Sequence, residues 1–224
     1  MKLETRYSNH PNDVKHYTTE ELREHFLIEK VFVADEVQLT YSHNDRIIAG
    51  GIMPVEQQLT LVAGKEMGVD SFFERREGEI INIGGSGRIV IDGEVFELNY
   101  QDGLYIGLGV KEITFESINQ EQPAKFYFNS APAHHHYPHT LITLEKANKV
   151  HLGSDAESNK RTINQYVHPA VCQSCQLVMG MTILAPNNMW KDVYKRQLYC
   201  HQIWKNLFRK SFKTSFRKYY DSKL

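Results

Sequence analysis

The chain has 224 residues, of which 41% are apolar, 24% charged and 11% aromatic, and its formal net charge at pH 7 is −1. This balance is typical of a soluble globular protein of one or two domains, and it excludes a disordered chain and a membrane-spanning one. Residues 1–22 lack the apolar core of a signal peptide, and three cysteines are too sparse and odd a set for a disulfide framework, so a cytoplasmic protein is expected.

The first predicted element is a short helix that begins after Thr18. Thr18 and Glu21 have the spacing of a capping box, in which each side chain accepts a hydrogen bond from the backbone amide of the other residue. Leu22 and Phe26 then fall on one face of the helix. We therefore expect one short N-terminal helix in the segment TTEELREHFLIEKVF.

From Ile28 onward the pattern changes to short apolar runs with a period of two. Such runs, separated by Gly, Asp and Asn at steady spacing, predict an all-β sandwich or barrel. The clearest local signal is Asp92-Gly93, because a two-residue hairpin needs positive φ at both central positions. A turn on Asp102-Gly103 and a Gly-x-Gly bend follow it. The expected strands lie in EKVFVADEVQLTYSH, RIIAGGIM, QQLTLVAG, SFFERREGEIINIGG, GRIVIDGEVFELNY, GLYIGLG and KEITFES.

This order of hairpin, Asp-Gly turn and Gly-x-Gly bend resembles the cupin family of double-stranded β-helix barrels. That family binds a metal through two histidines separated by one residue and a glutamate several positions on. The stretch of this chain that aligns with them begins at Gly68 and has Glu74, Arg75 and Arg76 where the histidines would be. Arginine does not deprotonate to bind a metal, so we expect this first barrel to be metal-free.

Longer segments are similar to one family of sugar isomerases, the 4-deoxy-L-threo-5-hexosulose-uronate ketol-isomerases, across residues 18–190. The resemblance implies a subunit of two cupin barrels, a homohexamer and one Zn²⁺ in the second barrel. It implies an aldose-ketose isomerase of pectin and uronate catabolism that converts 5-dehydro-4-deoxy-D-glucuronate to 3-deoxy-D-glycero-2,5-hexodiulosonate. The expected partner is thus a small acidic sugar, with no nucleic acid and no membrane. The similar segments are LIEKVFVADEVQLTYSHNDRIIAGGIMP, FFERREGEIINIGGSGRIVIDG, PAKFYFNSAPAH, SNKRTINQY and CQLVMGMTILAPNNMW.

The resemblance also divides the chain. Residues 1–150 are expected to form the metal-free first barrel, and residues 151–190 to begin a second barrel that stays incomplete. In the family, the strand after the NMW segment carries the zinc ligands, which are a His-x-His pair, a glutamate and a distant histidine. Residues 191–224 hold one histidine and no glutamate, so we expect this chain to bind no zinc and to be an inactive fragment.

Residues 191–224 differ in composition from the rest of the chain. They carry ten Lys or Arg and two Asp, a net charge near +8, whereas residues 1–190 carry 16 basic and 25 acidic residues, near −9. One interpretation is a foreign or out-of-frame sequence after a truncated gene. The other is a genuine tail, because as a helix it places an aromatic residue at every fourth position with basic flanks. The alternative function is then a non-catalytic cupin whose basic amphipathic tail binds a membrane or a partner.

The candidate residues for binding the substrate carboxylate are Lys160, Arg161 and Arg46, because basic side chains, and guanidinium forks above all, bind carboxylates. Lys160 and Arg161 rank first because they precede the second barrel, where the family's pocket lies. Arg75 and Arg76 are further candidates, with neighbouring glutamates available for ion pairs. The catalytic residues stay unknown.

Two other groups of residues invite a metal or redox interpretation. Histidines cluster in APAHHHYPHT, but adjacent side chains of an extended segment point in different directions, and the flanking prolines favour a connector with surface histidines. Cys172 and Cys175 form a C-x-x-C without the βαβ setting of a redox motif, which favours chance spacing.

Overall fold

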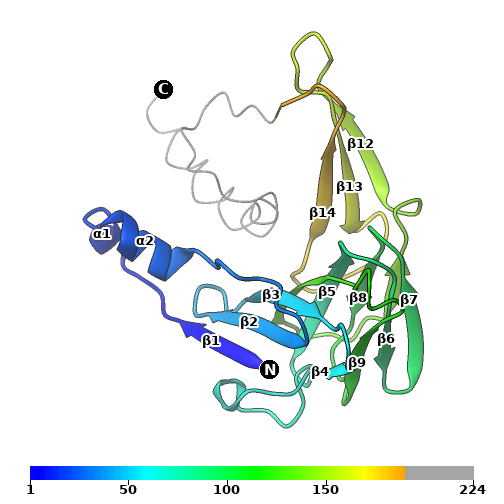
Figure 1. Cartoon of the computed structure of the whole chain (residues 1–224). Coiled ribbons are helices and arrows are strands. Elements are labelled where there is room, and N and C mark those ends of the chain that lie inside the picture. Colours follow the sequence, from blue (N-terminus) through cyan, green and yellow to red (C-terminus); the bar gives the residue numbers. More distant parts are fainter. Residues whose placement is uncertain (190–224) are drawn as a thin grey trace. The chain divides into compact units, whose positions relative to one another are not determined.

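The computed structural model describes residues 1–189 (Figure 1), so the predicted basic tail lies outside the described residues. The chain divides into two compact units. Unit 1 comprises residues 1–145 and 174–177, and the described part of unit 2 comprises residues 146–173 and 178–189. The expected domain boundaries at residues 150 and 190 stay predictions.

Unit 1 is built on two β-sheets, one of seven strands in the order β1-β2-β3-β10-β5-β8-β11 and one of four in the order β4-β9-β6-β7 (Figure 1). Neighbouring strands are antiparallel except β1 and β2. This confirms the all-β, cupin-type fold that the sequence predicts. The strands are β1 (Lys2–Arg6), β2 (Glu36–Ser42), β3 (Ile48–Met53), β4 (Leu59–Thr60), β5 (Arg76–Asn82), β6 (Gly87–Ile91), β7 (Glu94–Leu98), β8 (Gly103–Ile106), β9 (Ile113–Ser117), β10 (Phe126–Pro132) and β11 (Thr140–Ile142).

The expected helix is α2 (Thr19–Phe26), and its capping box is confirmed. The Thr18 amide donates to Oε2 of Glu21 at 2.7 Å, and the Glu21 amide donates to Oγ1 of Thr18 at 3.2 Å. Two shorter helical elements lie in the same unit, the single turn α1 (Pro11–Val14) and the 3₁₀ turn η1 (Lys65–Met67). They are too short to show a helical period in the sequence.

The core of unit 1 is filled by apolar side chains of both sheets. Ile80 on β5 and Phe128 on β10 represent the seven-stranded sheet, and Ile89 on β6 and Phe115 on β9 represent the four-stranded one; all four are 0% exposed. Gly78 allows a ring to pack against the strand, because a Cβ there would lie 2.6 Å from Cε1 of Phe73. Alternate residues of the strands therefore face one shared core.

The turns show where local sequence rules hold and where they do not. Asp92 and Gly93 have φ of 47° and 90° and join β6 to β7, so the predicted hairpin is confirmed. The turn expected on Asp102-Gly103 lies earlier, because Gln101 has the positive φ of 70° and Gly103 already begins β8. The Asp102 carboxylate fixes this turn by accepting the Asn99 amide at 2.9 Å.

Unit 2 is, in its described part, a three-stranded antiparallel sheet in the order β12-β13-β14. The strands are β12 (Asn148–Leu152), β13 (Arg161–Val167) and β14 (Met179–Leu184). The register shifts between Gln165 and Val167, which marks an irregularity in β13. Among residues 1–189 no helix is long and apolar enough to cross a bilayer.

Candidate functional site

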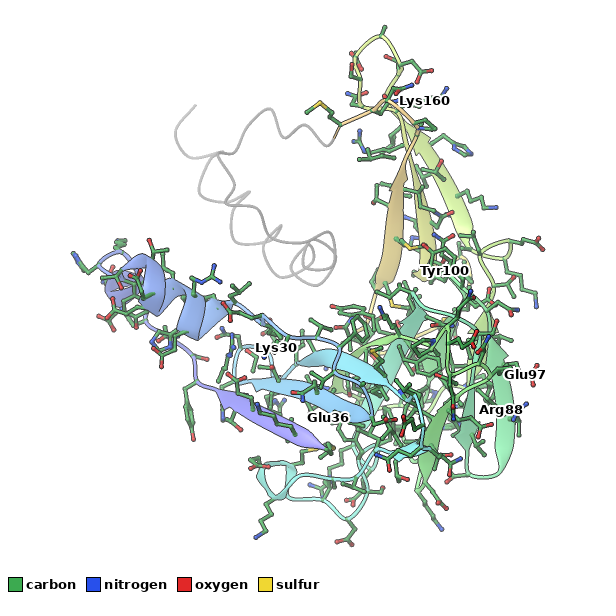
Figure 2. All side chains as sticks on the ribbon, in the orientation of Figure 1. Lys30, Glu36, Arg88, Glu97, Tyr100 and Lys160 are labelled. Carbon is green, nitrogen blue, oxygen red and sulfur yellow. The ribbon has the colours of Figure 1, made fainter. Side chains whose placement is uncertain are left out.

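An open pocket of about 390 Å³ lies at one end of the unit 2 sheet. Lys160 and Arg161, the first-ranked candidates for the substrate carboxylate, both line it. Figure 2 labels Lys160 on the loop that leads into β13. The chain brings these two residues to the pocket because Arg161 begins β13 and pairs with Leu152 and Leu184 on either side. The complete lining is His151, Leu152, Gly153, Lys160, Arg161, Thr162, Ile183, Leu184, Ala185 and Pro186.

Each of the two cations of this pocket contacts a partner within unit 2. Nζ of Lys160 lies 2.7 Å from Oδ2 of Asp155, and both side chains are more than half exposed. The hydrogen bond from Lys160, followed by one from Asn188, lowers the pKa of the Asp155 carboxyl. Nη1 of Arg161 donates to the Asn159 carbonyl at 3.0 Å. Because an exposed ion pair contributes little free energy, an incoming carboxylate can replace Asp155 at little cost.

His151 is a pocket residue that the sequence did not single out. It lies on β12 opposite Thr162, and its Nδ1 is 3.0 Å from Oγ1 of Thr162. The antiparallel register therefore places an imidazole beside the cations at residues 160 and 161. The alternation of NKVHL is a weak signal for a strand, and no local pattern indicates which strand pairs with it.

Arg46, the third candidate, lies in unit 1. It occupies the turn between β2 and β3 with φ of 52°, and its side chain is exposed. Its carbonyl accepts a hydrogen bond from Nη2 of Arg76 at 2.6 Å. Because Arg46 and the pair at residues 160 and 161 belong to different units, the structure describes no site that they share.

The two arginines at the cupin histidine positions have different roles. Arg75 is exposed and pairs with Glu74, with 3.4 Å between Nε and Oε1. Arg76 is 7% exposed and donates to the hydroxyl of Ser130 at 3.0 Å and to its carbonyl at 2.9 Å. Its guanidinium also lies over the ring of Tyr41, and burial lowers its pKa to about 10. Arg76 is therefore a buried structural cation and does not form the ion pair that its glutamate neighbours offered.

The residues of the described part do not fit a metal ion. Among residues 1–189 no group of three or more His, Cys, Asp or Glu side chains is arranged to hold one. At the position where a cupin places a histidine, the guanidinium of Arg76 adds a positive charge that repels a cation. Residues 1–189 therefore do not provide the ligands for a catalytic metal ion.

The histidine cluster serves a backbone bend. Nδ1 of His139 accepts the Gly107 amide at 3.1 Å, so its proton resides on Nε2, and Nδ1 of His136 is 2.7 Å from the Leu108 carbonyl, so it carries the proton. Burial lowers the pKa of His139. His134 and His135 are exposed, in the manner expected of a connector. Two of the four side chains thus hold the Gly-x-Gly bend, which composition alone did not indicate.

The cysteines of the C-x-x-C are both free thiols. Sγ of Cys175 donates to the His135 carbonyl at 3.3 Å. Cys172 belongs to unit 2 and Cys175 to unit 1. The structure thus describes no redox pair at this motif.

Comparison with known proteins places these features in one family. Residues 26–192 match the KduI/IolB family. The 4-deoxy-L-threo-5-hexosulose-uronate ketol-isomerase of Halalkalibacterium halodurans is 51% identical over 191 residues, which cover 85% of this chain and 69% of that protein. The protein of the same name from Lachnoclostridium phytofermentans is 54% identical over the same shares of both chains.

A solved structure of an IolB-like protein from Salmonella typhimurium is similar at 13% identity, with a TM-score of 0.45, over 57% of this chain and 47% of that chain. The family assignment does not depend on this distant likeness. It follows from a match that takes in most of both units and from relatives that share half of their residues with this chain. The chain belongs to the KduI/IolB family.

Proposed function

We propose that this polypeptide is, by descent, a ketol-isomerase of uronate catabolism, an enzyme that converts 5-dehydro-4-deoxy-D-glucuronate to 3-deoxy-D-glycero-2,5-hexodiulosonate, and that this chain itself is inactive. The observation that carries the proposal is the identity of 51% and 54% to two proteins named for this isomerase over 85% of the chain. The reaction moves a carbonyl group between adjacent carbons. It requires transfer of a proton and an electrophile that polarises the sugar oxygens.

Lys160 and Arg161 are the residues that we propose to bind the substrate carboxylate. Both line the unit 2 pocket, and the ammonium and guanidinium groups supply charge-assisted donors of the kind that hold carboxylates. The ion pair of Lys160 with Asp155 is exposed and therefore opens at little cost in free energy. Leu152 and Ile183 add apolar surface to the lining of this pocket.

The metal of the family requires ligands that the described residues do not provide. Members of the family are metal-dependent cupin isomerases, and we propose that Zn²⁺ is the ion, which polarises the substrate oxygens when bound. A catalytic zinc site uses three protein ligands, and residues 1–189 offer no such group. Residues 190–224 contain one histidine and no glutamate. We therefore propose that this chain on its own binds no stoichiometric zinc and is inactive.

The family resemblance also supports two proposals about cellular context. We propose that active members of this family are homohexamers and that they work in the cytoplasm on a small acidic sugar. No nucleic acid or membrane has a part in this proposal. Analytical ultracentrifugation of an active family member measures this assembly. A monomer would refute the proposed homohexamer.

Zinc content and activity test the proposed inactivity. The full 224-residue chain, purified and dialysed after exposure to Zn²⁺, is analysed by atomic spectrometry and assayed for conversion of the keto-uronate. We expect far less than one zinc per chain and no turnover, because the ligand set is missing. Turnover with zinc at unit occupancy would contradict the inactivity while it supports the isomerase assignment.

Carboxylate binding tests the pocket separately from catalysis. D-galacturonate, a stable uronate, is titrated into the ¹⁵N-labelled chain and followed by NMR shifts of the β13 amides. We expect Arg161→Gln and Lys160→Gln each to weaken binding roughly tenfold, which corresponds to one charge-assisted hydrogen bond. Lys149→Gln, at an exposed position on β12, is the matched control. Equal binding by all three variants would exclude residues 160 and 161 as the carboxylate site.

A further inference from the structure

Two buried carboxylates lie two residues apart on one face of β5. Glu77 is 0% exposed and Glu79 is 2% exposed, although glutamates on a strand ordinarily face solvent. Because alternate strand residues share a face, both point away from the core that Ile80 joins. Neither carboxylate is part of an ion pair within residues 1–189. Their environments nevertheless differ in the number of hydrogen-bond donors.

Glu77 is surrounded by donors from a segment about a hundred residues away. Its Oε1 accepts the amides of Gln176 at 2.6 Å and Leu177 at 2.8 Å. Its Oε2 accepts the amide of Cys175 at 2.7 Å and the hydroxyl of Tyr105 at 2.7 Å. These four donors satisfy both oxygens of the Glu77 carboxylate. We call residues 174–177 the strap.

Besides Glu77, the strap is held by the side chain of Leu177, which is 5% exposed, and by two further hydrogen bonds. The Ser174 hydroxyl donates to the Leu177 carbonyl at 2.6 Å, which closes the strap on itself. The Cys175 thiol donates to the His135 carbonyl at 3.3 Å, a weak bond. Neither β13 nor β14 belongs to unit 1. The backbone amides of the strap are therefore held by the Glu77 carboxylate, which accepts all three of their hydrogen bonds.

Glu79 has one neutral partner. Nδ2 of Asn129 donates to its Oε1 at 3.2 Å, while Oε2 of Glu79 and Oδ1 of Asn129 are buried and have no partner within the described chain. The titratable groups that face it are Glu77 on its own strand, Tyr105 opposite it on β8 and Tyr127 beside Asn129 on β10. None of these is a cation. Burial above all, opposed by the hydrogen bond from Asn129 and assisted by the charge of Glu77, raises the pKa of Glu79 to about 8.

We propose that Glu77 and Glu79 form a proton-controlled latch, in which protonated Glu79 allows Glu77 to hold the strap and ionised Glu79 releases it. When Glu79 loses its proton, a second negative charge appears about 7 Å along the same strand face, in a site where residues 1–189 place no cation. The β-sheet ladders on both sides of β5 resist separation. The strap, whose three amides bind one carboxylate, is the element that dissociates from Glu77.

Amide exchange of the strap tests the latch on the full chain. Protection factors of residues 175–177 are measured from pH 6 to pH 9, each corrected for the intrinsic exchange rate at that pH. We expect them to fall roughly tenfold or more between pH 7 and pH 9, as Glu79 ionises. The amides of the β6–β7 hairpin stay protected, which excludes global unfolding.

Substitution of each glutamate by glutamine distinguishes the roles of the two carboxylates. Glu79→Gln keeps the neutral state, so protection of the strap becomes independent of pH, whereas Glu77→Gln loses protection at every pH. Glu112→Gln, at an exposed position, is the matched control and behaves as the wild type. The latch is refuted if strap protection in the wild type does not change with pH, or if it falls equally in Glu79→Gln.

A second measurement on the unsubstituted chain covers the case in which Glu79→Gln does not fold. ¹³C-detected NMR of the glutamate carboxyls gives the titration midpoint of Glu79, which we expect to coincide with the midpoint of strap release. A Glu79 that titrates below pH 5, or a strap that opens at a different pH from the titration, overturns the proposal.

Discussion

At the scale of single residues, Arg76 and Glu77 are adjacent in sequence but have different partners, because consecutive side chains of a strand point to opposite faces. The sequence offered Glu74 and Glu77 as ion-pair partners for Arg75 and Arg76. The pair between Arg75 and Glu74 forms, but Arg76 and Glu77 are consecutive strand residues and face opposite sides. Arg76 therefore binds Ser130 across the sheet, and Glu77 binds the strap.

His139 shows how one buried hydrogen bond makes stability depend on pH. Its Nδ1 accepts the Gly107 amide, and protonation would destroy this bond. Burial lowers the pKa of His139 in the folded state below that of the unfolded chain. The unfolded chain therefore takes up the proton first, so the contribution of His139 is present at pH 7 and above and is lost as the pH falls below about 6.5.

We expect His139→Asn to reduce the loss of unfolding free energy between pH 7 and pH 5. The Asn carboxamide oxygen replaces Nδ1 as the acceptor but does not titrate. The measurement is urea unfolding at both pH values, with His134→Asn as the control because His134 is exposed. An identical pH dependence in the wild type and His139→Asn would show that the ring does not couple to folding.

At the scale of elements, the short-range motifs were predictable and the edge strands were not. The capping box and the Asp92-Gly93 hairpin depend on residues within four positions of one another, so the sequence states them directly. β1 and β12 have no apolar run to mark them. They become strands because β2 and β13 offer a free edge with complementary hydrogen-bonding groups.

The hairpin depends on Gly93, whose φ is 90°. A Cβ at this position meets no other atom within 4 Å, so the cost of substitution is backbone strain alone. We expect Gly93→Val to lower the unfolding free energy of unit 1 by about 2 kcal/mol, and Gly93→Asn by about half as much or less, because Asn tolerates positive φ. Urea unfolding measures both. Equal losses would indicate steric crowding instead of strain.

At the scale of the whole molecule, the two units differ in how much apolar surface they bury. The central core cluster is drawn entirely from unit 1. The described part of unit 2 is a three-stranded sheet whose buried apolar side chains are Ala147, Tyr166, Val167 and Met179. A sheet of this size is near the limit of independent stability.

We therefore expect unit 2 to open before unit 1. In native-state hydrogen exchange, the amides of β13 should exchange with a free energy at least about 2 kcal/mol below that of β5 and β10, because few buried contacts oppose local opening. Increasing urea in small steps separates local opening from global unfolding. Equal exchange free energies in β13 and β5 would mean that the two units unfold as one.

The sequence by itself determined the β-rich class, the N-terminal helix cap, the hairpin and, through its longer segments, the family. It also ranked Lys160 and Arg161 first, and the structure places both in one pocket; their contact with substrate stays a prediction. These features follow from residues close together in the chain or from strings shared with relatives.

Only the tertiary structure decided which polar groups are buried and what satisfies them. Glu77 meets the strap about a hundred residues later, and β12 brings His151 to the pocket opposite Thr162. The physical reason is that a buried carboxylate such as that of Glu77 must find its donors wherever the sheets place them, and that strand pairing brings together residues far apart in the chain. That placement is a property of the folded chain in space and leaves no local mark in the sequence.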